Sequence, residues 1–330
     1  MPRYVALAML LAPCADFWFA PAHAGAASPV APYPSRPIRL LVGFPPGGTS
    51  DIVARALAER LVPALGQQIV VDNRAGAAGN IAVELAAKAS ADGYIMLLSS
   101  GSNTVAPSLN PRLGYDIERD FAHVTRFADV PFMLVVPAAL PVASVSELIA
   151  LAKARPGELN FASSGLGTPA HLAGELFKQA TGVNVVHVAY KGTAPALVDL
   201  LAARVQFYFT SFPGALAHVQ GGRLRAIAVT KAARSPILPQ VPTLTEAGVP
   251  DYRAGSWYGV SLPVHAPRGV VGRLHAEIQS ALRDAGLTAR LGDQGLDVVP
   301  GVTPEQFARF VREDRQRWAR VIERAGIGAR

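Results

Sequence analysis

The chain has 330 residues, of which 50% are hydrophobic and 17% charged, and this balance excludes an intrinsically disordered protein. At about 150 residues per domain, the length predicts two domains. Lys and Arg outnumber Asp and Glu by 31 to 24, a net charge of +7, but no basic stretch with interleaved aromatic residues indicates nucleic-acid binding. The single cysteine excludes an intramolecular disulfide and a cysteine-rich zinc module.

The first residues have the pattern of a secretory signal peptide. Arg3 provides a positive start, and residues 5–12 form an apolar run that is too short to span a bilayer. Ala22-His23-Ala24 has the small-x-small form of a signal-peptidase site. We therefore expect cleavage after Ala24.

This prediction divides the N-terminal region into a signal peptide over residues 1–24 and a Pro- and Ser-rich lead over residues 25–35. The mature protein would then be exported and would contain no cysteine. Two alternatives are an N-terminal helix that is retained and a lipoprotein with lipid attached to Cys14, although Pro13 fits the second poorly.

Short apolar segments then alternate with amphipathic helical patterns. After the first expected strand, Val53, Leu57 and Leu61 recur at helical spacing. Strands separated by helices of about 10–15 residues predict parallel sheets with crossover helices, and therefore an α/β fold. The expected strands are 38–42, 69–71, 95–98, 133–136, 185–188, 205–209 and 224–229.

Two later helices have clear boundary signals. Ser144-x-x-Glu147 and Thr303-x-x-Gln306 are capping boxes, and Pro304 suits a first helical position. Pro156-Gly157 should end the helix that Ser144 begins. In the C-terminal helix, Phe307, Val311, Trp318 and Ile322 share one face, and an arginine-rich opposite face should be solvated rather than dock a partner.

Small, glycine-rich loops recur at strand ends and before helices. Glycine lets the backbone approach a ligand, and a helix N-terminus offers free N–H groups with partial positive charge. Such loops meet at the carboxyl edge of a parallel sheet, so together they predict a site for a small anion. Taken singly, each is also explained as a tight connection to a capped helix. The loops are 44–51, 73–80, 99–103, 163–169 and 190–195.

Catalytic motifs fit the sequence less well. The sequence contains no G-x-S-x-G, no G-x-x-x-x-G-K-[ST] and no complete dinucleotide fingerprint. Its seven histidines include no pair at helical spacing, so we expect neither a metal nor a cofactor. A serine hydrolase would need Ser164, His171 and Asp51 to meet, a combination that any chain of this length can supply.

Three polar residues in these loops, or just after one of them, have two interpretations each. Asp51 either bonds N–H groups of its own loop or meets an ammonium group of the ligand. His171 either caps and packs locally or contacts the ligand. Lys191 is either a solvated charge or an anion contact.

Taken in order, a series of segments over residues 34–328 resembles the receptors of tripartite tricarboxylate transporters, the Bug (Bordetella uptake gene) family. These segments are 34–38, 44–51, 70–74, 91–94, 115–116, 120–121, 163–177, 190–192 with 195–196, 224–229, 241–243 and 257–259. Ala203 departs from the family pattern, which often has glycine at that place.

The resemblance implies an α/β, two-lobed periplasmic-binding-protein (type II) fold, with each lobe a mostly parallel sheet flanked by helices. By similarity the chain crosses between lobes near 130–131 and 255–257. Lobe 1 would then comprise residues 36–130 and 257–330, and lobe 2 residues 131–256.

The function implied is that of a non-enzymatic, monomeric receptor that closes on a small carboxylate and delivers it to integral-membrane permease subunits driven by ion gradients. The ligand could be a dicarboxylate, an aromatic acid or an amino acid. In this family backbone N–H groups, hydroxyls and ordered water hold the carboxylate, and these contacts do not distinguish one carboxylate from another. An exported serine hydrolase and a receptor that feeds a sensor kinase are the alternatives.

The resemblance also implies which residues contact the ligand, at the positions that match the family's motifs. From the first lobe these are Gly47, Gly48, Thr49 and Asp51, with Gly76, Ala77, Ser100 and Ser102 as weaker candidates. From the second lobe they are Ser164, Gly165, Gly167, Thr168, His171, Tyr190, Lys191 and Gly192.

Overall fold

The computed structural model describes residues 1–2, 33–324 and 326–327, so the predicted signal peptide, its cleavage at Ala24 and the alternative lipid site at Cys14 lie outside the described residues. The strands are β1 (Ile38–Val42), β2 (Ile69–Asn73), β3 (Ile95–Ser100), β4 (Phe121–Pro137), β5 (Asn160–Ser163), β6 (Val186–Ala189), β7 (Phe207–Ser211), β8 (Leu224–Val229), β9 (Gly255–Pro263) and β10 (Asp297–Val298). The helices are α1 (Thr49–Leu65), α2 (Asn80–Ala87), α3 (Gly101–Leu109), α4 (Val145–Ala154), α5 (Pro169–Thr181), α6 (Thr193–Leu201), α7 (Phe212–Gln220), α8 (Arg268–Leu282), α9 (Ala285–Asp293) and α10 (Pro304–Arg324), with a 3-10 turn, η1, at Ala77–Gly79.

The strands form one sheet in the order β2-β1-β3-β9-β4-β7-β5-β6, with β8 and β10 also paired to β4. As expected, β1 pairs in parallel with β2 and β3, and β5 pairs in parallel with β6 and β7. These strands have few polar side chains because helices cover the sheet, and Met133, Leu134, Val135 and Val136 are completely buried. The α/β prediction is confirmed.

Sequence periodicity did not predict strand β9 or the antiparallel pairings in the sheet. Strand β9 lies antiparallel between β3 and β4, and β4 is antiparallel to β7 and β8. The predicted segment 133–136 is only the end of the 17-residue strand β4.

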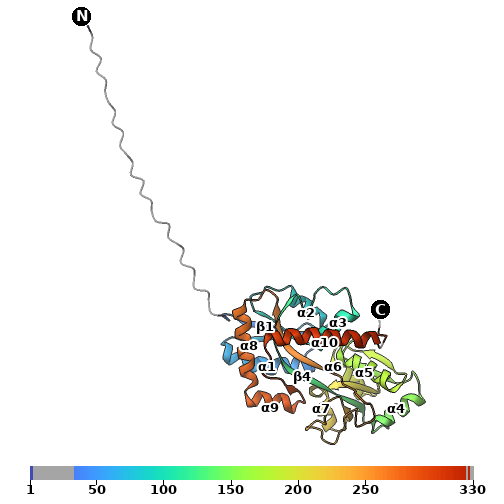
Figure 1. Ribbon diagram of the computed structural model, residues 1–330. Coiled ribbons are helices and arrows are strands. Elements are labelled where there is room, and N and C mark those ends of the chain that lie inside the picture. The colour runs from blue at the N-terminus through green and yellow to red at the C-terminus, as the bar shows by residue number, and fades with distance from the viewer. Residues whose placement is uncertain (3–32, 325, 328–330) are drawn as a thin grey trace. The chain divides into compact units, whose positions relative to one another are not determined.

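Strand β4 is a long central strand of the sheet (Figure 1). It changes partners part of the way along its length. Residues 121–131 pair with β9, whereas residues 132–137 pair with β7 and β8. We call β1, β2, β3, β9 and residues 121–131 the first half-sheet, and β5, β6, β7, β8 and residues 132–137 the second half-sheet. At the exchange point Pro131 pairs with Gly255, so the chain leaves and returns at adjacent positions.

The predicted helix boundaries are present in the structure. The Ser144 side chain accepts a hydrogen bond from the Glu147 N–H, and α4 ends at Ala154, before Pro156. Thr303 and Gln306 bond each other reciprocally, from the Thr303 N–H to Gln306 Oε1 at 2.9 Å and from the Gln306 N–H to Thr303 Oγ1 at 3.3 Å. These bonds satisfy N–H groups that a helix start leaves without partners.

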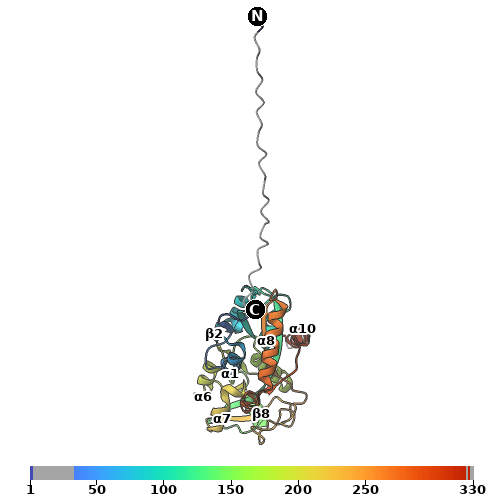
Figure 2. The same ribbon diagram turned by 90° about the vertical axis from the view of Figure 1, so that its left-hand side faces the viewer.

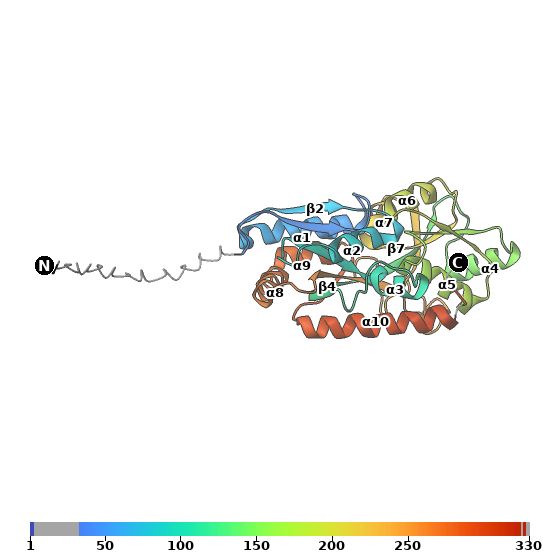
Figure 3. The same ribbon diagram turned by 90° about the horizontal axis from the view of Figure 1, so that it is seen from above.

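Helix α10 buries the four apolar side chains that the sequence placed on one face. Trp318 and Ile322 pack with Val105 of α3 and Leu172 of α5, and α10 runs past both helices (Figure 3). Helix α8 packs against α1 (Figure 2). Among the described residues, no helix has both the length and the apolar character needed to cross a bilayer.

Candidate functional site

A cavity of about 50 Å³ lies where the two half-sheets meet. We call it the serine-lined cavity because six serines contribute to its wall. It can hold a few water molecules or a small anionic group. The lining residues are Phe44, Pro45, Gly48, Thr49, Ser50, Ser100, Ser102, Val130, Phe132, Ser164, Pro169, Ala170, Thr193, Ala194, Tyr208, Phe209, Ser211, Ser256 and Tyr258.

The start of five helices contributes to this wall. Thr49 begins α1, Thr193 begins α6, and Ser211 is the N-cap of α7. Ser100 is the N-cap of α3, and Pro169 begins α5. Among the described residues, no Lys, Arg, His, Asp or Glu lines this cavity. The electrostatic field in the cavity therefore comes mainly from helix N-termini and hydroxyl dipoles, which favour an anion.

The loop before α1 is fixed by Asp51. Gly47 has φ +76°, in the left-handed region that favours glycine, and its N–H donates to Asp51 Oδ2 at 3.0 Å. Arg55 Nε donates to the same carboxylate at 3.0 Å. Burial alone would raise the pKa of Asp51, but the hydrogen bonds from Arg55 and Gly47 outweigh it and the pKa is lowered. Of the two readings of Asp51, the structure therefore shows the one in which it organises its own loop.

Hydroxyl groups connect the walls of the serine-lined cavity. Thr49 Oγ1 and Ser211 Oγ lie 2.6 Å apart, and Ser50 Oγ lies 2.9 Å from the Tyr258 hydroxyl. The Gly101 N–H donates to Ser256 Oγ at 3.3 Å. The cavity therefore has several hydroxyl groups that can exchange a protein partner for a ligand oxygen.

Two neutral phenols complete the wall. Burial raises the pKa of Tyr258 to about 12, although the hydrogen bond with Ser50 acts in the opposite direction. Burial also raises the pKa of Tyr208. Its side-chain hydrogen bonds with Thr193, Ser164 and Thr210 lower the pKa and offset part of this effect. Both tyrosines remain protonated at neutral pH and can donate an O–H to an anion.

A second cavity of about 360 Å³ adjoins the first, and Phe44 and Ser164 line both. We call it the glycine-lined cavity. Its wall includes the 76–80 segment and α3 on one side and the 164–167 and 189–191 segments on the other. Within the part of the chain that the structure describes, Lys191 is the only Lys or Arg in its lining, and no Asp or Glu lines it.

The predicted site residues fall into three groups. Gly48, Thr49, Ser100, Ser102 and Ser164 line the serine-lined cavity. Gly76, Ala77, Ser164, Gly165, Gly167, Tyr190 and Lys191 line the glycine-lined cavity. The remaining five, Gly47, Asp51, Thr168, His171 and Gly192, line neither.

The residues of the last group hold the cavity-lining loops in place through hydrogen bonds and close packing. Thr168 Oγ1 donates to the Gly165 carbonyl at 2.8 Å and accepts the His171 N–H, which caps α5. Gly192 has φ +123°, and a Cβ there would lie 2.8 Å from Pro45 Cδ. Glycine at this position thus lets the loop before α6 approach the loop before α1.

Sequence reasoning missed Ser50, Tyr208, Ser211, Ser256 and Tyr258. Ser211 is a small residue between the end of a strand and the start of a helix, as in the other predicted loops. The segment Ser211-Phe212-Pro213-Gly214 shows this pattern in the sequence and could have identified Ser211. Tyr258 and Ser256 lie on β9, a strand that was not predicted.

The structure does not assemble the hydrolase trio. Asp51 is bonded to Gly47 and Arg55, whereas His171 Nδ1 accepts the Gly167 N–H at 3.2 Å. Within the described part of the chain, no group of three His, Cys, Asp or Glu side chains is arranged to hold a metal ion.

An α/β fold with an anion-attracting cavity at the meeting of two half-sheets is typical of a protein that binds a small solute. Residues 53–327 match the model of the tripartite tricarboxylate transporter family receptor, and the chain belongs to this family. The family consists of periplasmic solute-binding receptors rather than enzymes, and the predicted resemblance is confirmed.

Individual relatives agree with this assignment. The chain is 42% identical to Protein BugT of Bordetella pertussis, over 92% of this chain and 94% of that protein. A solved Rhodopseudomonas palustris protein with adipate is 39% identical, with a TM-score of 0.87 over 89% of this chain and 98% of its own. MatC from the same organism, with bound malate, is 29% identical, with a TM-score of 0.84 over 88% of this chain and all of its own.

Proposed function

We propose that this receptor captures a small carboxylate between two lobes and delivers it to the permease subunits of a tripartite tricarboxylate-type secondary transporter. In this proposal the serine-lined cavity holds one carboxylate group, and the adjoining glycine-lined cavity holds the rest of the molecule. Lys191 is available there for a second anionic group.

The observation that carries the proposal is the meeting of five helix N-termini at a cavity whose described lining residues are all uncharged. Each helix end contributes roughly 0.3–1 kcal/mol to binding an anion. Each hydrogen bond to a charged group adds about 1.5–3 kcal/mol. Micromolar affinity requires about 8 kcal/mol, which these helix ends and a few hydroxyl or N–H donors supply together.

The proteins solved with adipate and with malate support a carboxylate as the ligand class. Both molecules carry two carboxylates joined by a short aliphatic chain. The small residues of the glycine-lined cavity, among them Ala77, Ala78 and Ala106, suit an aliphatic portion of this kind.

The proposed lobes are residues 36–130 with 257–330, and residues 131–256. The exchange of partners along β4 supports a boundary at Pro131, because each part of the strand is bonded to a different half-sheet. Hinge closure would bring the donors of both lobes around one anion, and the open and closed forms would differ in affinity for the permease. Export by the predicted signal peptide would place the receptor beside that permease.

A thermal-shift screen of the mature protein, residues 25–330, tests the ligand class. The panel contains adipate, malate, an aromatic acid and an amino acid, each with its neutral amide as the matched control. A ligand at 100 times its Kd adds about 2.7 kcal/mol to the stability of the folded state, which raises Tm by several degrees. A shift for one acid but not for its amide is the expected result.

The variant Gly48→Val tests whether the ligand binds at the loop before α1. Gly48 has φ −84° and ψ 171°, an extended backbone that valine also adopts, and a Cβ there would meet only the Pro45 carbonyl, at 3.5 Å. The variant should fold and lose the ligand-induced shift, whereas Gly272→Val on the exposed side of α8 should keep it. If Gly48→Val binds normally, the first loop does not hold the ligand.

Absence of any shift requires that the protein be unfolded, stripped of retained ligand, refolded and screened again. If the stripped protein also fails to respond, the carboxylate proposal is wrong. Hydrolysis of an ester panel would then test the exported-hydrolase alternative, and co-purification with a permease or a histidine kinase would distinguish the two receptor alternatives.

A further inference from the structure

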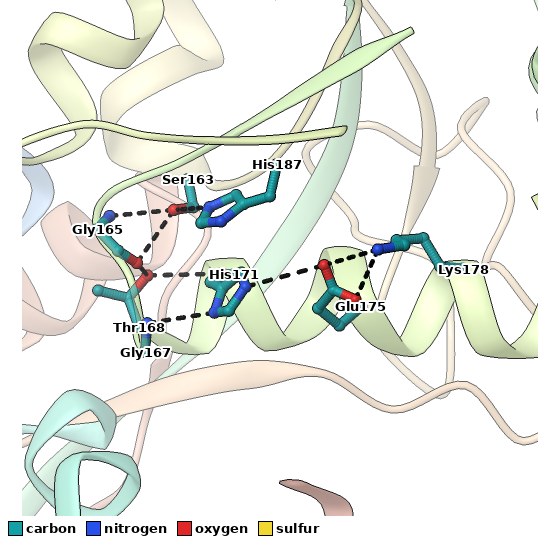
Figure 4. A network of polar contacts seen from close by, with 8 residues as sticks. All are labelled: Ser163, Gly165, Gly167, Thr168, His171, Glu175, Lys178 and His187. Atoms are coloured by element: carbon teal, nitrogen blue, oxygen red, sulfur yellow. Dashed lines mark hydrogen bonds and ion pairs between the residues drawn. The ribbon is translucent and has the colours of Figure 1, made fainter. Parts of the chain in front are cut away.

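Two imidazoles lie stacked beside the loop of residues 163–168 (Figure 4). His171 belongs to the first turn of α5 and His187 to β6. Their ring centroids are 4.0 Å apart, with the ring planes inclined by 24°. Neither ring lines the serine-lined or the glycine-lined cavity, but each is bonded to the loop that does.

The bond between His171 and the loop defines the protonation state of its ring. The Gly167 N–H donates to His171 Nδ1 at 3.2 Å, so Nδ1 must carry a lone pair. The proton of the neutral ring is therefore on Nε2, which lies 3.8 Å from Glu175 Oε1. A second proton could be added only at Nδ1, where it would remove the acceptor of the Gly167 N–H.

The other end of the loop is held through His187. His187 Nε2 lies 2.6 Å from Ser163 Oγ, and the same hydroxyl accepts the Gly165 N–H at 3.1 Å and contacts the Gly165 carbonyl at 3.0 Å. The segment between these two anchors carries Ser164, which lines both cavities. Displacement of Gly167 would therefore move a residue of the cavity wall.

We propose that neutral His171 is the positioning residue for the 163–168 loop, and that adding a proton to its Nδ1 releases Gly167 and weakens ligand binding. This inference rests on the proposed function only for its ligand-binding part. The coupling of the loop to the imidazole is a property of the free protein and can be measured without a ligand.

The surroundings of the ring keep it neutral. Burial lowers the pKa of His171 to about 4, although Glu175 acts in the opposite direction. Burial, together with His171 and Lys178, lowers the pKa of His187 to about 3. Among the described residues, the titratable groups that face the pair are Glu175 and Lys178 on α5, and Phe161 of β5 stacks on both rings. Glu175 is itself paired with Lys178 at 2.9 Å, which limits its support for an imidazolium.

The matched variants are His171→Asn and His171→Leu. Asparagine can place its Oδ1 near the position of Nδ1, so it keeps an acceptor for Gly167 but cannot be protonated. Leucine fills the space and removes the acceptor. The control is His218→Asn, at a half-buried histidine on α7.

The first readout uses the free, mature protein. Imidazole nitrogen shifts should show an unprotonated Nδ1 on His171 at pH 7.5. Amide hydrogen exchange of residues 164–168 at that pH should be unchanged in His171→Asn and His218→Asn, and at least tenfold faster in His171→Leu. A protonated Nδ1 at neutral pH, or unchanged exchange in a folded His171→Leu, would overturn the proposal.

The second readout is the affinity for adipate, the probe in these titrations. At pH 7.5, His171→Asn should bind within about threefold of the original protein, and His171→Leu at least tenfold more weakly. Comparison with His171→Asn at each pH cancels the titration of adipate itself. The original protein should lose about fourfold affinity relative to His171→Asn at pH 3.5, as expected for a group with a pKa of about 4.

Identical pH profiles for the original protein and His171→Asn contradict the protonation step. If no carboxylate binds the original protein at all, the proposed function fails, while the exchange and nitrogen-shift measurements still decide whether His171 positions the loop.

Discussion

The hydroxyls of Thr49 and Ser211 lie 2.6 Å apart, although 162 residues separate them in the chain. Thr49 begins α1 and Ser211 caps α7, so this one hydrogen bond joins helix N-termini that follow strands of different half-sheets. Both hydroxyls also line the serine-lined cavity. The contact therefore links the stability of the folded protein to the residues that are available for a ligand.

A double-mutant cycle on Thr49→Val and Ser211→Ala tests this link. Each single change leaves a buried hydroxyl without its partner and should reduce the free energy of unfolding by about 1–3 kcal/mol. The double variant should lose less than the sum, with a coupling of about 0.5–1.5 kcal/mol. Urea unfolding of the four proteins gives the coupling. Thr49→Val combined with the distant Thr303→Ala should be additive, and an additive Thr49/Ser211 cycle would mean that the bond is energetically unimportant.

Asp51→Asn should destabilise the protein and weaken ligand binding. The carboxylate is 5% exposed and bonds both Gly47 and Arg55, so its neutral replacement should cost about 1–2 kcal/mol at pH 7, after allowance for the solvent-exposed Arg55. Because the pKa of Asp51 is lowered in the folded state, its contribution is present above about pH 4 and is lost as the pH falls below that. Urea unfolding at pH 7 and pH 3 should therefore show a smaller difference between the variant and the original protein at pH 3. An equal difference at both values would contradict the assigned role.

Ala203→Gly should stabilise the protein. Ala203 is exposed and has φ +56°, a left-handed conformation that costs a non-glycine residue about 1–2 kcal/mol. Relief of this strain exceeds the extra chain entropy of glycine, so we expect a net gain of about 0.5–1 kcal/mol in thermal or urea unfolding. Its neighbour Ala202, with φ −82°, is the matched control, and Ala202→Gly should lower stability. Equal effects of the two substitutions would rule out backbone strain as the cause.

Stability should fall as the pH decreases from about 6.5 towards 4. Burial lowers the pKa of His123 to about 4, and the pKa values of His171 and His187 are about 4 and about 3. These rings are neutral in the folded protein at pH 5.5 but largely protonated in the unfolded chain, which therefore binds about two to three more protons. Urea unfolding between pH 7 and pH 5 measures this slope. His123→Asn, which retains an acceptor for Ser261, should reduce the slope by about one proton, and an unchanged slope would show that His123 is not neutral when folded.

Local signals in the sequence predicted the parallel part of the fold well. The strand 38–42 was predicted with the bounds of the parallel strand β1, and the capping boxes at Ser144 and Thr303 identified the helix starts. These features depend on residues that are close in the chain. Strand β9 was missed because Gly255, Ser256 and Gly259 interrupt its apolar pattern, and its identity depends on pairing with distant β3 and β4.

The residues of the candidate site also divide into those with a local sequence signal and those whose position depends on distant parts of the chain. Glycine-rich loops marked Gly48, Ser100 and Ser164, because a close backbone approach leaves a local signature. Tyr208 and Tyr258 lie in strands whose side chains alternate between faces, and the sequence alone does not say which face meets a cavity. The sequence marked His171 as a candidate just after the 163–169 loop, but its stacking on His187 depends on the pairing of β5 with β6.

The pairing of Pro131 with Gly255 has a consequence for how the protein could be re-engineered. The segment from residue 132 to residue 254 begins and ends at neighbouring points of one hydrogen-bonded ladder. It could therefore be exchanged for the equivalent segment of a relative through two adjacent junctions, without lengthening a loop. Such chimaeras would combine the first loop of one receptor with the 163–168 loop of another, and their ligand preferences would show which half of the contact surface discriminates among carboxylates.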